Sequence, residues 1–556
     1  MSLEIKYIDV PNGAQSSAEV SSVGRQAFSV DTDVAQGVSD TPWATLEYGG
    51  WVLDGTRAVM DDVPSRVGWW SDTLSGDDGR FLTPPVIEIS FPEPYSATGL
   101  TFTFSPSTDQ WCSEIHVTWL NGQTVLDQRT VYPDGSRWFL ANTVESFDKV
   151  RIALNATNTP NQFAKVQKIE IGQVVLFEED EIVSVNTVSD VDPALCLMPV
   201  DTSVVEIIDL HGRNLLPQSN QRMEIYQNGN LLETHYINSS IRSGKNRYSI
   251  RCQSAVGLLT DDFLGGMYSA VEAKALLQSV LDGVPFELHR SFSNAVISGY
   301  LPVCSRRQAL QQIAFAIGAV VTTQKSDVIQ LLPVQKTVGG VFSPDRVFQG
   351  GSARLSPRIS KVEVLSHKYS KSSDVETLVD DEYIDGEDVL ITFRNPHHSY
   401  SITGGTITDS NVNWIKVTAA GNVTVTGEKY NHTSMSHIRK NKYATASERN
   451  NVISVEDATL IHSGNVSAAL DRLYDSALLR QTVTQGVIVV GEMAGDCVAI
   501  PNPWGTQTNG VIASMDHRIT RNGHTARIVI HGVEVKMQTV NYYSGELYSG
   551  DKEVAY

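Results

Sequence analysis

The residues that most suggest chemistry are a cysteine and two arginines at the start of a predicted helix. They lie in GYLPVCSRRQALQQIAFAIGAVV, residues 299–321. A helix N-terminus and nearby cations lower the pKa of a thiol, which would make Cys304 a candidate nucleophile. A cysteine enzyme also needs a positioned histidine as base, and the sequence assigns none. We therefore expect Cys304 to be a small side chain that faces the core.

The helix itself explains most of this segment without catalysis. Ser305 and Gln308 have the S-x-x-Q spacing of a capping box, and an apolar stripe follows them. Arg306 and Arg307 fall in the first turn, where the helix dipole disfavours cations. We expect these two arginines to contact an acidic partner, for example on an adjacent subunit.

His397 and His398 form the densest histidine pair, in RNPHHSY. Adjacent side chains on a strand point to opposite faces, so both rings cannot bind one ion without an irregular loop. We expect a surface or subunit contact here rather than a metal site.

Trp69 and Trp70, in GWWSDTLSGDDGRF, are the best candidates for ligand binding. Adjacent tryptophans in a loop could offer an apolar platform to the face of a sugar. The alternative is that one ring fills the bottom of a β-sandwich and the other packs against the next domain. If the platform forms, Trp111 is the third candidate for a glycan contact.

The sequence lacks the motifs of the common enzyme classes. It contains no H-E-x-x-H, no G-x-S-x-G, no P-loop and no G-x-G-x-x-G between a strand and a helix. The five cysteines are far apart and form no C-x-x-C pair. A glycosidase pair stays open because carboxylates are plentiful, yet nothing singles one out. We expect a protein that is not an enzyme and that needs no cofactor and no metal.

Length and charge limit the remaining classes. A chain of 556 residues predicts about three to five domains. The net charge of -20 argues against nucleic-acid binding as the main task, because affinity for phosphate rests on clustered Lys and Arg. No apolar run approaches the roughly 20 residues that span a bilayer, and the start lacks a secretory signal. We expect synthesis in a cytoplasm.

Most predicted elements are strands. Short alternating segments and seven of the nine tryptophans indicate a β-sandwich over residues 37–178, after an N-terminal arm at 1–36. Strands continue over 182–253, and the Asn-Gly of QNGN marks a hairpin. Residues 254–345 predict a small α+β unit with two helices, the first from Ser269 with a capping box at Glu272.

The last third of the chain returns to strands. Residues 346–535 are mainly β, with one good helix at 465–481 whose expected N-cap is Ser463. Residues 536–556 form a polar, Tyr-rich tail.

Two resemblances cover nearly the whole chain. TPWATLEYGGWVLDG (41–55), GWWSD and FPEPYSATGLTFTF (91–104) resemble the discoidin-type (coagulation factor 5/8 C-terminal) jelly roll. From about residue 182 onward the chain resembles the baseplate hub proteins of contractile phage tails and phage tail-like particles. The segments that carry this second resemblance are residues 253–283, 299–323, 448–481 and 502–516.

The hub resemblance implies a structural role in the tail baseplate of a virion. It implies a homotrimer in which two β-barrels per chain, at 182–253 and within 346–535, form a ring of six around a channel. Such a ring joins the tail tube and distal tail proteins to the central spike, beside wedge proteins, and admits the tape measure and later DNA. The helical domain at 254–345 would pack outside.

The discoidin-like domain departs from this pattern and leaves alternatives open. It would brace the hub against neighbouring proteins or grip a host surface glycan. One rival function is a receptor-binding or glycan-binding tail protein that acts through Trp69, Trp70 and Trp111. A second rival is a tail-associated cell-wall hydrolase. The sequence leaves open whether the tail is contractile or flexible.

Overall fold

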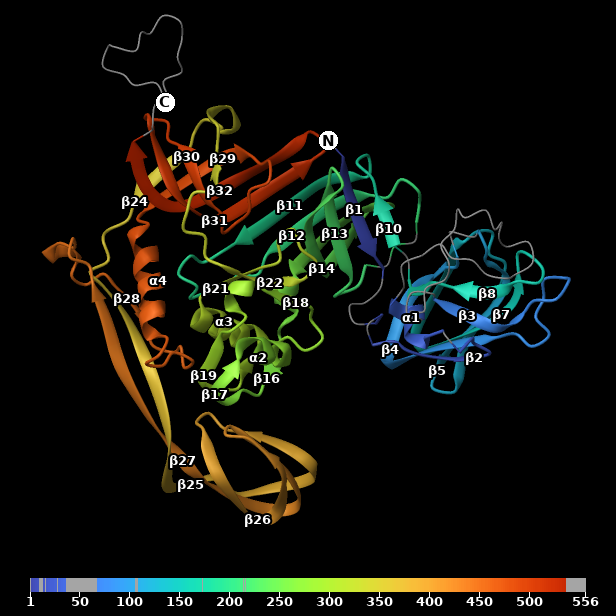
Figure 1. Cartoon of the computed structure of the whole chain (residues 1–556), viewed down its shortest axis with the longest axis horizontal. Helices are drawn as coiled ribbons and strands as arrows, with labels where there is room; N and C mark the ends of the chain where they lie inside the picture. Colours follow the sequence, from blue (N-terminus) through green and yellow to red (C-terminus); the bar gives the residue numbers. More distant parts are fainter. Residues whose placement is uncertain are drawn as a thin grey trace, which may run out of the picture.

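The computed structural model describes residues 2–9, 14–15, 17–27, 29–36, 68–105, 109–172, 174–213, 215 and 217–536. The described chain is mainly β and multidomain, which confirms the predicted class. Two β-barrels lie side by side, a small α+β unit lies below them, a long β protrusion extends away, and an N-terminal β-sandwich lies to one side (Figure 1). The segment 41–55 and the tail after Lys536 lie outside the described residues.

The N-terminal sandwich packs a larger sheet against a two-stranded one. Strand alternation buries one face of each sheet in a single apolar core. The larger sheet has the order β2-β4-β7-β5-β6, with β9 paired to β4, and β3 pairs with β8. The elements are β2 (Glu19–Val23), α1 (Asp31–Gln36), β3 (Trp69–Leu74), β4 (Val86–Thr103), β5 (Cys112–Asn121), β6 (Thr124–Val131), β7 (Arg137–Thr157), β8 (Phe163–Val166) and β9 (Lys168–Ile171).

The first barrel includes one strand that precedes the sandwich in the chain, β1, and one that follows it, β10. Its strand order is β10-β1-β13-β14-β15-β12-β11, around one core. The strands are β1 (Leu3–Ile8), β10 (Val174–Phe177), β11 (Ile182–Asp190), β12 (Thr202–Ile208), β13 (Arg222–Gln227), β14 (Asn230–Ser243) and β15 (Arg247–Ser254). The predicted arm at 1–36 therefore begins with a barrel strand, because β1 pairs with β13 with Ile5 opposite Ile225. The predicted QNGN hairpin is confirmed as the turn between β13 and β14.

The second barrel is built from the C-terminal part of the described chain. Its strands are β23 (Gly340–Val341), β24 (Ser352–Leu355), β29 (Gln481–Ile488), β30 (Cys497–Pro501), β31 (Thr506–Thr520) and β32 (Gly523–Lys536). β31 and β32 form the longest hairpin of this barrel and approach closely at Gly510 and Gly532. A Cβ at Gly510 would lie 2.2 Å from the carbonyl oxygen of His531, so only glycine fits there.

The α+β unit contains both predicted helices. Its elements are β16 (Asp262–Phe263), β17 (Gly266–Glu272), α2 (Ala273–Val280), β18 (Phe286–Leu288), β19 (Val296–Leu301), β20 (Cys304–Ser305), α3 (Arg306–Ile317), β21 (Ala319–Thr322) and β22 (Ile329–Pro333). The capping box of Ser305 and Gln308 is confirmed, and α3 ends at Gly318 with φ 81°. The expected cap at Ser269 is wrong, because Ser269 lies in β17 and α2 begins only after Glu272.

The segment 346–535 is divided rather than continuous. Between the strands of the second barrel it inserts a β protrusion, which we define as residues 361–440, with a small core of its own. The protrusion consists of β25 (Lys361–Thr392), β26 (His397–Ser410) and β27 (Trp414–Lys440). The elements β28 (Val452–Val455) and α4 (Val466–Leu478) follow it before the chain returns to the second barrel. The N-cap of α4 is Asn465, not the expected Ser463. Short 3-10 helices lie at Ala255–Leu258, Arg290–Phe292, Pro344–Arg346 and Ala446–Glu448.

Candidate functional site

The two barrels are joined strand to strand. β11 of the first barrel pairs with β12 on one side and with β31 of the second barrel on the other. The second pairing is antiparallel over six residue pairs, from Val185 opposite Ile519 to Asp190 opposite Ser514. The barrels therefore share one continuous sheet, whose ladder hydrogen bonds fix their relative orientation.

Side chains cross this joint in both directions. Ile519, from β31, is buried in the core of the first barrel. Val191, which follows β11, is buried in the core of the second barrel. Rotation of one barrel against the other would pull both side chains out of apolar surroundings, so the joint resists bending as well as sliding.

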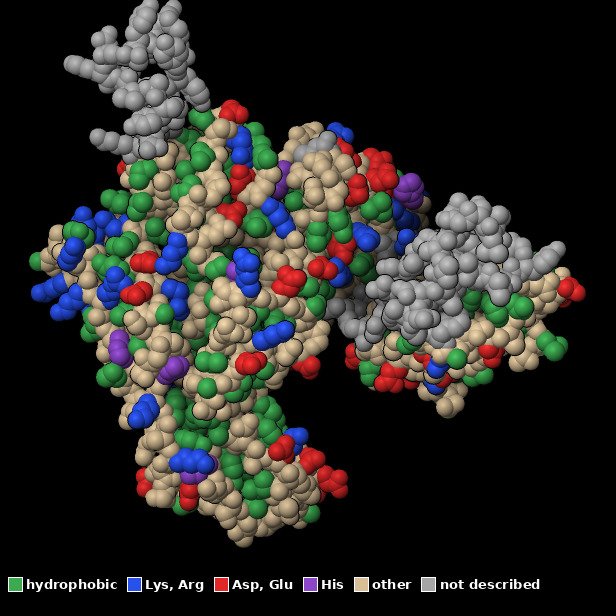
Figure 2. Space-filling view, in the orientation of Figure 1, with side chains coloured by type: hydrophobic (Ala, Val, Ile, Leu, Met, Phe, Trp, Pro, Cys, Tyr) green, Lys and Arg blue, Asp and Glu red, His purple; other side chains and the backbone are tan. Residues whose placement is uncertain are grey.

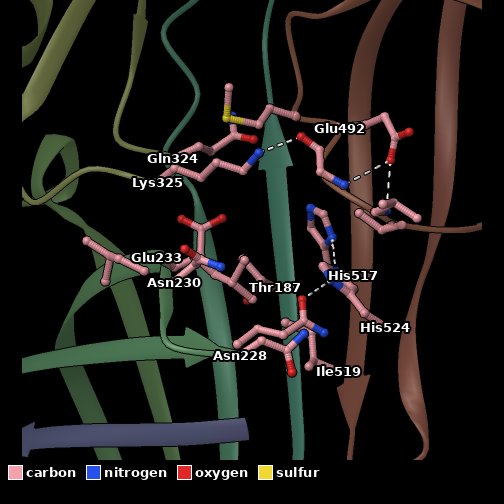
Figure 3. A pocket seen from close by; sticks show the side chains of 17 residues that line it. Thr187, Asn228, Asn230, Glu233, Gln324, Lys325, Glu492, His517, Ile519 and His524 are labelled. Carbon is pink, nitrogen blue, oxygen red and sulfur yellow. Dashed lines mark hydrogen bonds between the residues drawn. The ribbon is translucent and has the colours of Figure 1, made fainter. Parts of the chain in front are cut away.

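A polar cavity of about 540 Å³ lies beside the joint (Figure 3). Three groups of residues meet there: the β13–β14 turn, the turn after β21 and the loop after β29. Thr187 of β11 and His517 of β31 complete its wall. Of the described residues that line the cavity, Thr187 carries the only hydroxyl and none carries a thiol.

Two histidines form the polar centre of the cavity wall. Nδ1 of His517 lies 2.8 Å from Nε2 of His524, and Nδ1 of His524 lies 3.1 Å from Oε1 of Gln227. Burial, with smaller contributions from His524 and Lys325, lowers the pKa of His517 to about 3. Burial also lowers the pKa of His524 to about 4, although the nearby Glu492 opposes the shift. Both rings are therefore neutral at neutral pH, and the pair links β31 and β32 to the first barrel.

The charged groups around the cavity are tied to the protein itself. Nζ of Lys325 donates to the carbonyl oxygen of Gly491 at 2.5 Å. Arg346 forms an ion pair with Glu492 at 2.6 Å and also donates to the carbonyl oxygen of Ile488. Arg346 holds the pKa of Glu492 low although burial alone would raise it. Thr187 lies directly opposite His517 in the β11–β31 ladder, but among the described residues its hydroxyl has no hydrogen-bond partner.

Cys304 is a packed side chain and not an activated thiol. It contacts the core of the α+β unit and lies in β20, next to β16. Burial, aided by the nearby Asp262, raises the pKa of Cys304 to about 11. The thiol is therefore protonated at neutral pH, in agreement with the core position expected from the sequence.

The two arginines of α3 have different surroundings. Arg306 does not face an acidic group: its Nε donates to the carbonyl oxygen of Val280 at 2.6 Å, and one terminal nitrogen donates to that of Asp282. It thus caps the C-terminal end of α2, where the helix dipole favours a cation. Arg307 is exposed and lines an open cavity of about 630 Å³ with Asp190 among its neighbours. A partner contact through Arg307 stays a prediction.

Both members of the His397–His398 pair of the protrusion contact residues of the same chain. His397 is 3% exposed, its Nδ1 lies 2.9 Å from the carbonyl oxygen of Asn395, and its Nε2 lies 3.1 Å from Glu376. His398 lies 3.1 Å from Glu428 and is partly buried. The structure therefore gives His397 no free surface for the expected subunit contact.

The tryptophan platform is not present. Trp69 and Trp70 begin β3 and are 0% and 5% exposed. Nε1 of Trp69 donates to the hydroxyl of Ser22, and the ammonium of Lys165 lies 4.4 Å from the centre of the Trp70 ring. Trp69 belongs to the sandwich core, whereas Trp70, on the opposite face of β3, packs against Phe163 and Lys165. The alternative of packing therefore describes both rings better than an open sugar site.

Trp111 is half-buried, and its Nε1 donates to the carbonyl oxygen of Pro133 at 3.0 Å. It packs against the same sandwich core as Trp69. Its contact with a glycan stays a prediction, although the two rings that were to share the site are buried.

The sequence analysis predicted neither the joint nor its cavity. β11 and β31 lie more than 300 residues apart in the chain, and no short-range signal links such segments. Within the described ranges, no group of three or more His, Cys, Asp or Glu could hold a metal ion. The described helices include none that is long and apolar enough to cross a membrane.

Comparisons with known proteins find similarity only at the level of structure. No protein-family model matches the sequence, and no curated protein matches it either. The structure is similar to the 43 kDa tail protein of prophage MuSo2 from Shewanella oneidensis, with a TM-score of 0.39 and 11% identity over 64% of this chain and 95% of that one.

Two further similarities concern different parts of the molecule. The tail protein from Neisseria meningitidis MC58 has a TM-score of 0.38 and 13% identity, over 64% of this chain and 93% of that chain. The family 32 CBM of NanJ from C. perfringens, solved in complex with galactose, has a TM-score of 0.20 and 10% identity. It covers 31% of this chain and 99% of that chain.

Proposed function

We propose that this chain is a non-enzymatic hub protein of a phage tail baseplate, which works as a homotrimer. Three copies would contribute six barrels to a ring around the tail axis. The ring would join the tail tube and distal tail proteins to the central spike, with wedge proteins around it. The tape measure, and later the DNA, would pass through its channel.

The observation that carries this proposal is the strand-to-strand joint of the two barrels. Two barrels held by the β11–β31 pairing form one stiff wall segment rather than two independent domains. A ring that transmits force between a tube and a spike needs such segments, because a flexible linker would let neighbouring barrels tilt apart. The hub-like sequence segments from residue 253 onward support the same role.

The overall charge suits the proposed channel. With a net charge of -20, the chain offers few sites for the counterion release that drives DNA binding. A channel poor in Lys and Arg would let DNA pass without holding it. A channel wall rich in basic side chains in the assembled ring would contradict this part of the proposal.

The N-terminal sandwich would brace the hub against neighbouring proteins. Its tryptophans at 69 and 70 are buried, so they do not favour a glycan-binding function. The cavity beside the joint does not favour a cell-wall hydrolase, because the Thr187 hydroxyl makes no hydrogen bond to His517, its neighbour across the ladder.

The mass of the full chain in solution tests the trimer. Sedimentation equilibrium over a range of protein concentrations should give three times the mass of one chain. A chain that stays monomeric both alone and with the purified spike would contradict the proposal.

A further inference from the structure

The protrusion carries its charges in two separate groups. Its acidic end, residues 374–388, holds eight Asp and Glu and no Lys or Arg. Its basic base holds Lys440 at the end of β27, with Lys442 and Arg449 just beyond it, and Arg354 is a further cation on β24 of the second barrel; all four are exposed. Figure 2 shows Lys and Arg gathered at the left edge of the molecule and Asp and Glu toward the lower end of the protrusion.

The basic base has few partners within its own chain. In the described part of the chain, no ion pair joins Lys440, Lys442 or Arg449 to a carboxylate. Lys440 lies directly opposite Lys361 in the β25–β27 ladder. Lys361 is itself ion-paired with Glu363 at 2.6 Å, so Lys440 is the member of this facing pair that has no carboxylate partner among the described residues.

The acidic end is equally unpaired. Glu376 is bound by His397 and Lys429, but no ion pair is recorded for Glu382, Asp385 or Glu387, all of which the structure describes. The basic base cannot reach them within one copy. The ladder from Lys361–Lys440 to Lys371–Tyr430 is unbroken over ten residues, about 33 Å.

Each group surrounds large exposed apolar side chains. At the base, Leu355 is 67% and Tyr443 is 64% exposed; at the acidic end, Val375 is 65% and Tyr383 is 68% exposed. Protein interfaces combine apolar and aromatic centres with a polar rim, and tyrosine is frequent among their strongest contacts. The two surfaces therefore match each other in both charge and composition.

We propose that the acidic end of the protrusion in one copy docks on the basic base of a second copy. The contact rests on the proposed trimer, in which copies lie side by side, and it gives the protrusion the task of linking them. Lys440 and Lys442 would form ion pairs with Asp385 and Glu387. The exposed Tyr383 and Tyr443 would be buried in the contact. A nucleic-acid partner fits less well, because the rest of this acidic chain repels a polyanion.

The test uses the full chain and a zero-length carbodiimide cross-linker, which joins a lysine to a touching carboxylate. Equal amounts of 14N- and 15N-labelled protein are mixed and equilibrated before reaction. We expect cross-linked peptides of mixed isotope that join residues 440–442 to residues 380–388. Peptides linked only within one copy, or mixed peptides at other sites alone, would overturn the proposal.

Charge reversal provides the second arm. The variant Lys440→Glu/Lys442→Glu and the variant Asp385→Lys/Glu387→Lys should each lower the yield of the mixed cross-link and weaken self-association about tenfold. Mixing the two variants should restore association, since each reversed surface then meets its opposite. Lys274→Glu/Arg290→Glu, with the same change of net charge on exposed residues of the α+β unit, should have no such effect.

The outcomes separate this contact from the proposed function. A trimer by mass that is indifferent to both reversals would overturn the contact and leave the hub standing. A cross-linked species that grows as dimers or open chains would support the contact and contradict the trimer. Tight binding of a labelled DNA duplex that is lost in Lys440→Glu/Lys442→Glu, without the mixed cross-link, would overturn the contact in favour of a polyanion.

Discussion

The barrel joint and the protrusion differ in whether their charged groups have partners in the same chain. At the joint and in the α+β unit below it, ionic groups such as Arg346 and Arg306 are bound by groups of the same chain. On the protrusion, several exposed charges, among them Lys440, Lys442, Asp385 and Glu387, have no ion-pair partner among the described residues. The difference separates a part built to hold its shape from a part whose charges need another molecule. Substitutions in the two regions should therefore have different consequences.

The largest effect should come from opening the core at the joint. Met515 of β31 is fully buried and lies opposite Ser189 of β11. We expect Met515→Ala to lower the free energy of unfolding by about 2–5 kcal/mol, because it leaves a cavity. The matched control is Met435→Ala on the protrusion, where Met435 is 59% exposed and the change should be below about 0.5 kcal/mol. Equal effects in urea unfolding would contradict the comparison.

Acid should weaken the joint through its two histidines. The pKa of His517 and that of His524 lie below the ordinary value in the folded state, so the unfolded chain binds more protons between about pH 6.5 and pH 4. Stability from this pair is present above that window and is lost as the pH falls through it. We expect each histidine to contribute about 1–2 kcal/mol less stability at pH 5 than at pH 7.

The comparison with His517→Asn/His524→Gln isolates this effect. The variant should lose part of the pH dependence of thermal unfolding between pH 7 and pH 5, while other groups titrate equally in both proteins. Asp201, whose pKa is raised by burial, has the opposite sign and cancels in the difference. Identical slopes for the two proteins would show that the histidines do not stay neutral in the fold.

The next effect concerns two adjacent arginines. Arg306→Ala removes the donor from the end of α2 and should destabilise the chain by about 1 kcal/mol or somewhat more. Arg307→Ala, one residue away and exposed, should be close to neutral for stability. Chemical denaturation of both variants checks this, and a larger loss for Arg307→Ala would reverse the assignment.

The smallest effect should follow from neutralising the protrusion. Lys442→Ala and Asp385→Ala should each change the unfolding free energy of a dilute, dissociated chain by less than about 0.5 kcal/mol, because neither has an ion-pair partner among the described residues. A substantial loss in differential scanning calorimetry would mean that these charges already serve the single chain.

Local patterns in the sequence predicted local structure well. The capping box at Ser305 and the Asn-Gly turn before β14 both follow from neighbouring residues, and the structure confirms them. The cap at Ser269 failed because strand pairing of β17 with β19 overrides the local helix signal. Tertiary pairing decides between two local options, and a single sequence does not record it.

The candidate site was harder to predict from the sequence, for the same reason. Nothing near the hairpin that holds His517 and His524 announces that these residues will meet Gln227 and Lys325, which lie far away in the chain. The exposed platform expected of Trp69 and Trp70 failed because both lie in a strand, with Trp69 in the sandwich core and Trp70 packed against Phe163 and Lys165 on the other face. Adjacent aromatic residues signal binding only when a loop holds them at the surface.

The most direct test of the hub assignment is electron cryo-microscopy of the native particle. The account predicts that this chain lies on the tail axis between tube and spike, as three copies whose joined barrels form a ring of six. Density for the chain at the periphery of the tail, or an axial ring without these paired barrels, would contradict it.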